Sequence, residues 1–251
     1  MPTFQLVFFR SIGSVVCCLL AIFALKIENP IGNQKKWLIL RGLCGVVSML
    51  LFFKAIKLMP LGSAVTLRYI SPFFAAGLSL FFLKEKMRAI QWFYFFLAFM
   101  GVAILKGFDT RISLIGLMTI LAAAWFSGVV YFLIRKIGKS EHPIVIITYF
   151  MVIASIVGAV GMVFNFVKPE GIEWVLLMSM GIIGFVAQWF MTKAFQIEAS
   201  NKIVPFKYAE VIFTIVGAYF LFGESQSFVA IAAILLIVFA LIANVKVKSE
   251  T

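Results

Sequence analysis

The chain has 251 residues, of which 63% are hydrophobic and only 13% are charged, and its formal net charge is +12. A soluble domain carries about 25% charged residues and needs a polar exterior, so this composition excludes a soluble globular protein. The apolar residues fall into runs of about 20, the length of helix that crosses a bilayer. A membrane β-barrel is excluded because its strands alternate apolar and polar residues, whereas these runs are apolar on every face.

The runs predict an all-α, polytopic membrane protein with nine transmembrane helices. Short polar segments separate them, and none of these is long enough to fold alone. In chain order the predicted spans are Leu6 to Ile27, Trp37 to Ile56, Leu61 to Leu83, Ile90 to Leu105, Leu114 to Ile134, Ile144 to Phe166, Trp174 to Phe195, Ile203 to Phe222 and Phe228 to Val245.

The basic residues gather in the loops between these spans. If the C-terminus is cytoplasmic, 12 Lys and Arg residues lie in inner loops and four in outer loops, which satisfies the positive-inside rule. Topology thus explains the positive charge, and we expect the lipid bilayer as a partner and no nucleic acid. The prediction is a multi-pass protein of the cell (inner) membrane.

The second half of the chain repeats the first at a constant offset of 139 residues. The matches that carry weight pair Pro30 with Pro169, Gly42 with Gly181, Gly45 with Gly184, Tyr69 with Tyr208 and Glu85 with Glu224. The second unit, residues 112–247, holds five helices. Because five is odd, successive units enter the membrane in opposite orientations, as in an inverted repeat. The first unit, residues 1–107, holds four helices and lacks the equivalent of the first.

Several segments resemble the EamA-type branch of the drug/metabolite transporter superfamily over essentially the whole chain. The segments are Leu58 to Ala64, Ser71-Pro72, Lys84-Glu85 and Gln91-Trp92 in the first half, and Lys193 to Phe195, Val204 to Glu210 and Gly223-Glu224 in the second. The last set is similar to bacterial carriers of S-adenosylmethionine or related metabolites. The resemblance implies ten helices in two inverted repeats. Nine helices are predicted here, and whether the absence of the first reflects a late start codon or a real truncation is open.

Glu210 is the only one of the ten carboxylates placed deep in a predicted span. A charge at the bilayer centre costs about 2.5 to 3.5 kcal/mol on insertion scales, so it should face a cavity or a partner. Lys207 lies three residues earlier, within reach on the same helical face. Two interpretations stay open, an ion pair that stabilises packing and a site for substrate or a proton.

Helical spacing places Lys207, Glu210 and Thr214 on one face, and the 139-residue offset places Arg68 and Ser71 on the equivalent face. Two repeat-related helices thus present polar side chains together, as expected for a central transport site. The predicted substrate-binding residues are Arg68, Tyr69, Ser71, Lys207, Tyr208, Glu210 and Thr214.

Three further residues are predicted to be gating or structural. Pro72 permits a kink in its helix, and Glu85 and Glu224 match the helix-ending glutamate of the family. Arg41 is predicted to extend toward the membrane interface. For Arg10, cavity lining and structural pairing are both open.

The predicted function is a secondary transporter that carries a small polar metabolite, amino-acid-like and zwitterionic or anionic, by alternating access. The alternative is a non-transporting membrane scaffold or an inactive transporter remnant. We expect no enzyme activity, catalytic residue, metal or cofactor, because no phosphate-binding loop, nucleophile-base pair or ligand cluster is present. A coupled proton or ion and a homodimer are left open as partners beside the small-molecule substrate.

Overall fold

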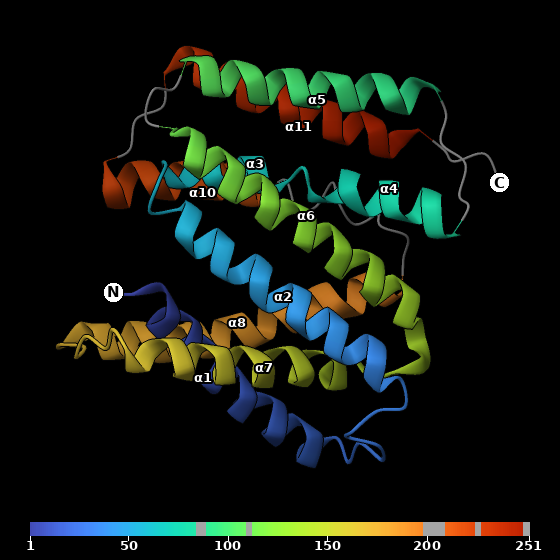
Figure 1. Ribbon diagram of the computed structural model, residues 1–251, viewed down its shortest axis with the longest axis vertical. Helices are drawn as coiled ribbons and strands as arrows, with labels where there is room; N and C mark the ends of the chain where they lie inside the picture. Colours follow the sequence, from blue (N-terminus) through green and yellow to red (C-terminus); the bar gives the residue numbers. More distant parts are fainter. Residues whose placement is uncertain (84–88, 109–111, 198–208, 224–226, 248–251) are drawn as a thin grey trace. The chain divides into compact units, whose positions relative to one another are not determined.

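The computed structural model describes residues 1–83, 89–108, 112–197, 209–223 and 227–247, and within these ranges it contains helices and no strand (Figure 1). The helices are α1 (Thr3–Ala24), α2 (Lys35–Ala55), α3 (Leu61–Arg68), α4 (Ser71–Leu83), α5 (Ala89–Phe108), α6 (Leu114–Ile137), the short 3-10 helix η1 (Gly138–Ser140), α7 (Pro143–Val163), α8 (Ile172–Ile197), α10 (Ala209–Phe222) and α11 (Phe228–Lys246).

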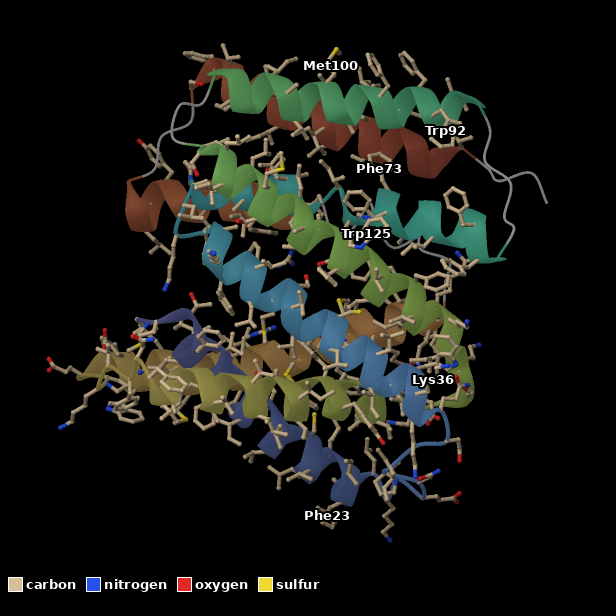
Figure 2. The ribbon with its side chains drawn as sticks, viewed as in Figure 1. Phe23, Lys36, Phe73, Trp92, Met100 and Trp125 are labelled. Atoms are coloured by element: carbon tan, nitrogen blue, oxygen red, sulfur yellow. The ribbon has the colours of Figure 1, made fainter. Side chains whose placement is uncertain are left out.

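Among the residues that the structure describes, five helical segments are long and apolar enough to cross a membrane: α1, α2, Leu114–Ser140, α7 and α8. Large apolar side chains such as Phe23, Trp92 and Met100 are exposed on the molecule (Figure 2). Hydrocarbon, and not water, is the solvent that suits such a surface. The prediction of a multi-pass helical membrane protein is therefore confirmed, while the count of nine spans stays a prediction.

The helix termini follow local sequence signals. Gly138, with φ at +57°, ends α6, as glycine commonly does because it adopts the left-handed conformation without strain. His142 caps α7 by accepting a hydrogen bond from the Ile144 amide at 3.3 Å, and Pro143 takes the first helical position, where no amide donor is needed. Ser227 caps α11 in the same way through the Ala230 amide.

The chain forms two compact units, and each combines segments from both halves of the sequence. Unit 1 comprises Met1–Leu50 and Leu133–Glu198, and unit 2 comprises Leu51–Phe132 and Ala199–Thr251. In unit 1, α1 packs against α7 and α8, and α7 packs against α8.

Glycines make the close helix contacts of unit 1 possible. A Cβ atom on Gly181 of α8 would lie 2.7 Å from the Cα of Gly13 on α1, and one on Gly158 of α7 would lie 2.7 Å from the amide nitrogen of Phe8. Backbones approach this closely only where side chains are missing, which is the usual way that membrane helices pack.

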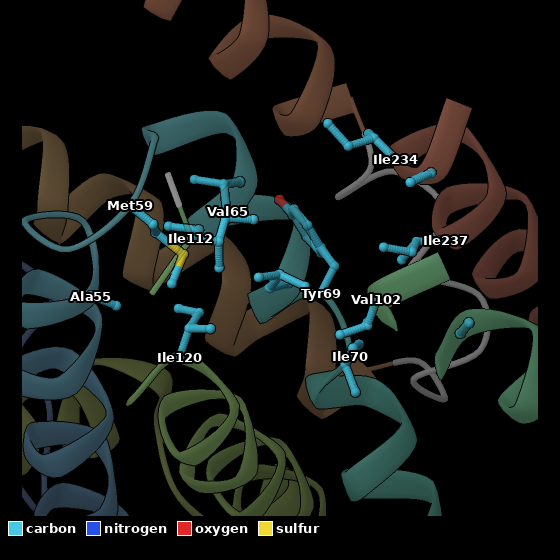
Figure 3. Close-up of a cluster of buried hydrophobic side chains, with 14 of the residues drawn as sticks. Ala55, Met59, Val65, Tyr69, Ile70, Val102, Ile112, Ile120, Ile234 and Ile237 are labelled. Atoms are coloured by element: carbon cyan, nitrogen blue, oxygen red, sulfur yellow. The ribbon is translucent and has the colours of Figure 1, made fainter. Parts of the chain in front are cut away.

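In unit 2, α5 packs against α11, and α3 packs against both α10 and α11. The core of this unit is an apolar cluster that gathers side chains such as Ile70, Val102, Ile234 and Ile237 from three segments distant in sequence (Figure 3). The two helices of the α5 and α11 pair lie side by side along their length (Figure 1).

The predicted span from Leu61 to Leu83 is not one continuous helix in the structure, because it is interrupted just before Pro72. Helix α3 ends at Arg68 and α4 begins at Ser71. The amides of Tyr69 and Ile70 donate to carbonyls three residues back, at 3.0 and 3.3 Å, which tightens the turn. Pro72 has no amide hydrogen and cannot donate to the Arg68 carbonyl, so the regular ladder fails at this point.

Candidate functional site

The predicted polar site falls within unit 2, where α3 and α10 pack against each other. Arg68 is the last residue of α3 and is half-buried. Its guanidinium carbon lies 4.2 Å from the centre of the Phe52 ring. A cation over an aromatic face is attracted by the ring quadrupole, by about 0.5 to 2 kcal/mol depending on desolvation. Phe52 thus holds the cation at the point where the helix is interrupted.

Two other predicted residues lie directly at the interruption and are buried. Tyr69 is 5% exposed and its ring lies among apolar side chains of the unit 2 core (Figure 3). Ser71 is 2% exposed. Helix α6 approaches closely here, because a Cβ on Gly128 would lie 2.8 Å from the Ser71 carbonyl oxygen. Helix α6 therefore covers the interruption at Ser71.

The other half of the predicted site is described only in part. Glu210 is the second residue of α10 and Thr214, one turn later, is half-buried. The side chain of Glu210 lies outside the described part of the structure, as do Lys207 and Tyr208. The gating candidates Glu85 and Glu224 also lie outside it. The structure brings α3 and α10 together, and the pairing of Lys207 with Glu210 stays a prediction.

Ser63 is a polar residue of α3 that the sequence analysis did not single out. Its hydroxyl is fully buried and has no hydrogen-bond partner among the described residues. Thr66, three residues later, donates from its hydroxyl to the Gly62 carbonyl at 2.8 Å and is thereby satisfied. The signal in the sequence was a pair of small polar residues, Ser63 and Thr66, three positions apart near the start of a predicted span.

Arg41 is wrongly predicted to reach the membrane interface. It is 1% exposed, its Nη2 donates to Gln188 Oε1 of α8 at 3.0 Å, and its guanidinium carbon lies 4.4 Å from the centre of the Phe150 ring of α7. Gly42 and Gly45 explain the burial: a Cβ on either would lie within 3 Å of an α7 side chain. Because α7 comes so close to α2, the arginine is enclosed between helices.

Arg10 brings a second guanidinium into the interior of unit 1. It is half-buried, and its Nη1 donates to the sulfur of Met49 on α2. A Cβ on Gly184 of α8 would lie 3.1 Å from its Nε. Since Gln188 is one helical turn beyond Gly184, Arg10 and Arg41 reach α8 on neighbouring turns. The structure thus favours structural pairing for Arg10, and it places two guanidinium groups inside unit 1.

Comparison with known proteins agrees with this architecture. The sequence profile of the EamA-like transporter family matches residues 1–106 and 114–245. A pseudopaline exporter, CntI of Pseudomonas aeruginosa strain UCBPP-PA14, is 29% identical over 99% of this chain and 88% of its own length. An S-adenosylmethionine uptake transporter of Rickettsia felis is 26% identical over 88% of this chain and 76% of its own length.

One further sequence relative and one solved structure are also similar to this chain. A riboflavin transporter of Vibrio cholerae is 23% identical over 84% of this chain and 72% of its own length. A solved crystal structure, 18% identical in sequence, superposes with a TM-score of 0.73 over 96% of this chain and 86% of the other, which shows a common fold. The three sequence relatives are named as transporters or exporters and not as enzymes. Because the profile covers nearly all of its length, the chain belongs to the EamA-like transporter family of the drug/metabolite transporter superfamily.

Proposed function

We propose that this protein is a secondary transporter that moves a small polar metabolite, amino-acid-like and zwitterionic or anionic, across the cell membrane by alternating access. Its relatives are named for the uptake or export of small metabolites. Transporters of this kind are commonly built from inverted repeats, and their sites lie where the repeats meet.

The observation that carries the proposal is the packing of repeat-equivalent helices against each other. Adding 139 to the bounds of α1 and α5 gives residues 142–163 and 228–247, and the helices found there are α7 (Pro143–Val163) and α11 (Phe228–Lys246). Helix α1 packs on α7, and α5 packs on α11. Subtracting 139 from the bounds of α10 gives residues 70–83, where α4 (Ser71–Leu83) lies, and α10 packs on α3, the helix that precedes α4.

The same correspondence extends to individual contacts. Gly181 of α8 meets Gly13 of α1, and its equivalent Gly42 of α2 meets Ile153 of α7. Position 153 lies within one residue of the equivalent of Gly13. Mutual packing of equivalent helices is what a two-fold relation between repeats produces. It supports a carrier in which the two repeats exchange roles, with the C-terminus placed in the cytoplasm by the charge distribution.

The substrate site that we propose combines Arg68 at the end of α3 with Lys207 and Glu210 around the start of α10. Two cations and one carboxylate suit a ligand that has a carboxylate of its own and an amino group. The helices α3 and α10 are in contact, and Arg68 is half-buried at the helix interruption. Broken helices inside membranes are tolerated where they are buried in protein or line a water-filled cavity, and in transporters they commonly form the substrate site.

The test is flux into proteoliposomes with a panel of labelled amino acids, S-adenosylmethionine and riboflavin. We expect uptake or efflux of at least one compound above that of protein-free liposomes. Glu210→Gln should lower this flux by about 10- to 100-fold, the worth of one hydrogen bond to a charged group. Glu224→Gln, the comparison variant at a predicted gating or structural position, should keep some of the activity. Equal flux through wild type and Glu210→Gln would remove Glu210 from the mechanism.

A further inference from the structure

One end of unit 1 is held by a buried carboxylate in a loop. Glu141, between η1 and α7, is 4% exposed, and its Oε1 accepts hydrogen bonds from the amides of Asn33 and Gln34, each at 2.6 Å. These amides directly precede α2, where a helix has donors without partners in its own backbone. Hydrogen bonds to an ionised acceptor are about twice as strong as neutral ones. The carboxylate therefore fastens the loop between α1 and α2 to the turn before α7.

The loop is shaped around this carboxylate. Gly32 has a φ of +71°, and a Cβ there would lie 2.8 Å from Glu141 Oε2, so glycine is required on both counts. Nε2 of Gln34 donates to the Ser140 hydroxyl at 2.6 Å. The Tyr149 hydroxyl of α7 donates to the Ile31 carbonyl at 2.8 Å. The side chains of Gln34 and Tyr149 thus join the same two segments that Glu141 joins.

Helix α8 joins the same contact through Gln196, close to its C-terminal end. Nε2 of Gln196 donates to the carbonyls of Gly138 and Glu141, at 2.6 and 2.8 Å. Three segments that are far apart in sequence therefore meet at this end of unit 1. We call these residues, Ile31 to Gln34, Gly138 to Glu141, Tyr149 and Gln196, the Glu141 latch.

The other end of α1 is held by a different contact. The side chain of Gln5 donates to the Val167 carbonyl at 2.6 Å and accepts from the Val167 amide at 3.0 Å, which ties the start of α1 to the loop between α7 and α8. The two contacts are separated by the length of α1, about 30 Å at helical rise. Of these two contacts, the one around Glu141 uses a charged side chain and the one around Gln5 does not.

We propose that the Glu141 latch is a conformational device: it closes one end of unit 1 and opens during the transport cycle. This inference rests on the proposed function, because alternating access requires one end to part while the other stays closed. The latch suits this role because its contacts are polar and involve loop backbone. Water replaces each of them when the segments part, so the net cost of opening is small. The backbone contact between Gly13 and Gly181 has no such replacement.

The first test measures whether breaking the latch admits water, and it needs no substrate. Thr192 of α8 is 0% exposed and lies one turn before Gln196, so a thiol there reports opening. Thr192→Cys is introduced into the full chain after Cys17, Cys18 and Cys44 have been replaced by alanine. In lipid nanodiscs, Glu141→Ala should raise the rate of labelling by a water-soluble maleimide about tenfold or more, as expected for a shift in a two-state population.

The matched control is Glu173→Ala. The Glu173 carboxylate also accepts a loop amide, from Glu170 at 2.9 Å, but in the loop between α7 and α8. We expect this variant to label as slowly as the parent. Equal labelling of the parent and Glu141→Ala, or an equal rise in both carboxylate variants, would overturn the proposal. If Glu141→Ala does not fold, Glu141→Gln replaces it, because its amide oxygen can still accept a hydrogen bond and should give a smaller rise.

The second test locks the latch shut. Gln34→Cys and Ser140→Cys place thiols on two side chains that are hydrogen-bonded to each other, and a reducible bifunctional methanethiosulfonate reagent can bridge them. The bridged protein should lose transport and regain it on reduction. Undiminished transport while bridged would identify the contact as a static support and contradict the latch. If wild type transports none of the compounds, the proposed function fails, and the labelling test still decides whether the latch opens.

Discussion

Gly181→Ala is the substitution whose effect follows most directly from the packing of unit 1. The added Cβ would lie 2.7 Å from the Gly13 Cα, 3.1 Å from its carbonyl carbon and 3.3 Å from the Ser14 nitrogen. All three are backbone atoms, so no change of rotamer relieves the clash. Ordinary contact begins at 3.4 Å, and helices α1 and α8 must therefore separate by about 0.7 Å.

The expected magnitude combines three terms. Overpacking of this kind costs about 1 to 3 kcal/mol. The hydrogen bond from the Ser14 hydroxyl to the Gly181 carbonyl, 2.7 Å long, weakens and adds about 0.6 kcal/mol, the average measured for side-chain hydrogen bonds between membrane helices. Alanine recovers about 0.8 to 1 kcal/mol of helix propensity. The net loss is about 1 to 3 kcal/mol, or roughly 2 to 10 °C in the midpoint of thermal unfolding for a chain of this size.

The matched controls are two other helical glycines. A Cβ on Gly217 of α10 would meet nothing within 4 Å, so Gly217→Ala should leave the unfolding temperature unchanged or raise it. A Cβ on Gly42 would lie 2.5 Å from the end of the Ile153 side chain, which can move, so Gly42→Ala should fall between the two. The three variants are compared in one detergent by loss of the monodisperse size-exclusion peak on heating. A Gly181→Ala protein as stable as Gly217→Ala would refute the proposed backbone contact.

Two further predictions concern polar residues of unit 1. Arg41→Lys should lower the unfolding temperature, because an ammonium group cannot both donate to Gln188 and stack on Phe150 as the planar guanidinium does. A double-mutant cycle with Gln188→Ala should show a coupling energy of about 0.6 to 1.7 kcal/mol. Additive effects of the two substitutions would contradict the pairing. Burial, aided by the charge of Lys193, lowers the pKa of His142, the only histidine of the chain. The neutral form caps α7, so stability should decline as the pH falls below about 6.5, where the unfolded chain takes up the proton first. In His142→Asn, an uncharged cap, thermal unfolding between pH 8 and pH 5 should lose this dependence, and an unchanged pH profile would assign it to other groups.

Hydropathy predicted much of the fold because a bilayer imposes its thickness on each helix separately. The predicted spans Leu114 to Ile134, Ile144 to Phe166 and Phe228 to Val245 lie within a few residues of α6, α7 and α11. The predicted span from Leu61 to Leu83 differs from the structure at its middle, because an apolar run does not reveal where the ladder of backbone hydrogen bonds is interrupted. Pro72, which permits a kink, was the signal for this interruption, and the interruption begins three residues before it in the chain.

The environments of the polar residues depended on tertiary structure. The sequence alone determined the membrane class, the clustering of basic residues between the apolar runs and the spacing of 139 residues between similar segments. It did not determine that Arg41 is buried against Gln188, or that Glu141 holds a loop more than 100 residues away. The physical reason is that hydropathy is a property of one segment, whereas the partner of a polar group depends on which backbones approach. In unit 1, glycines of α1, α2 and α8 decide which backbones approach, because their missing side chains let helices that are distant in sequence meet.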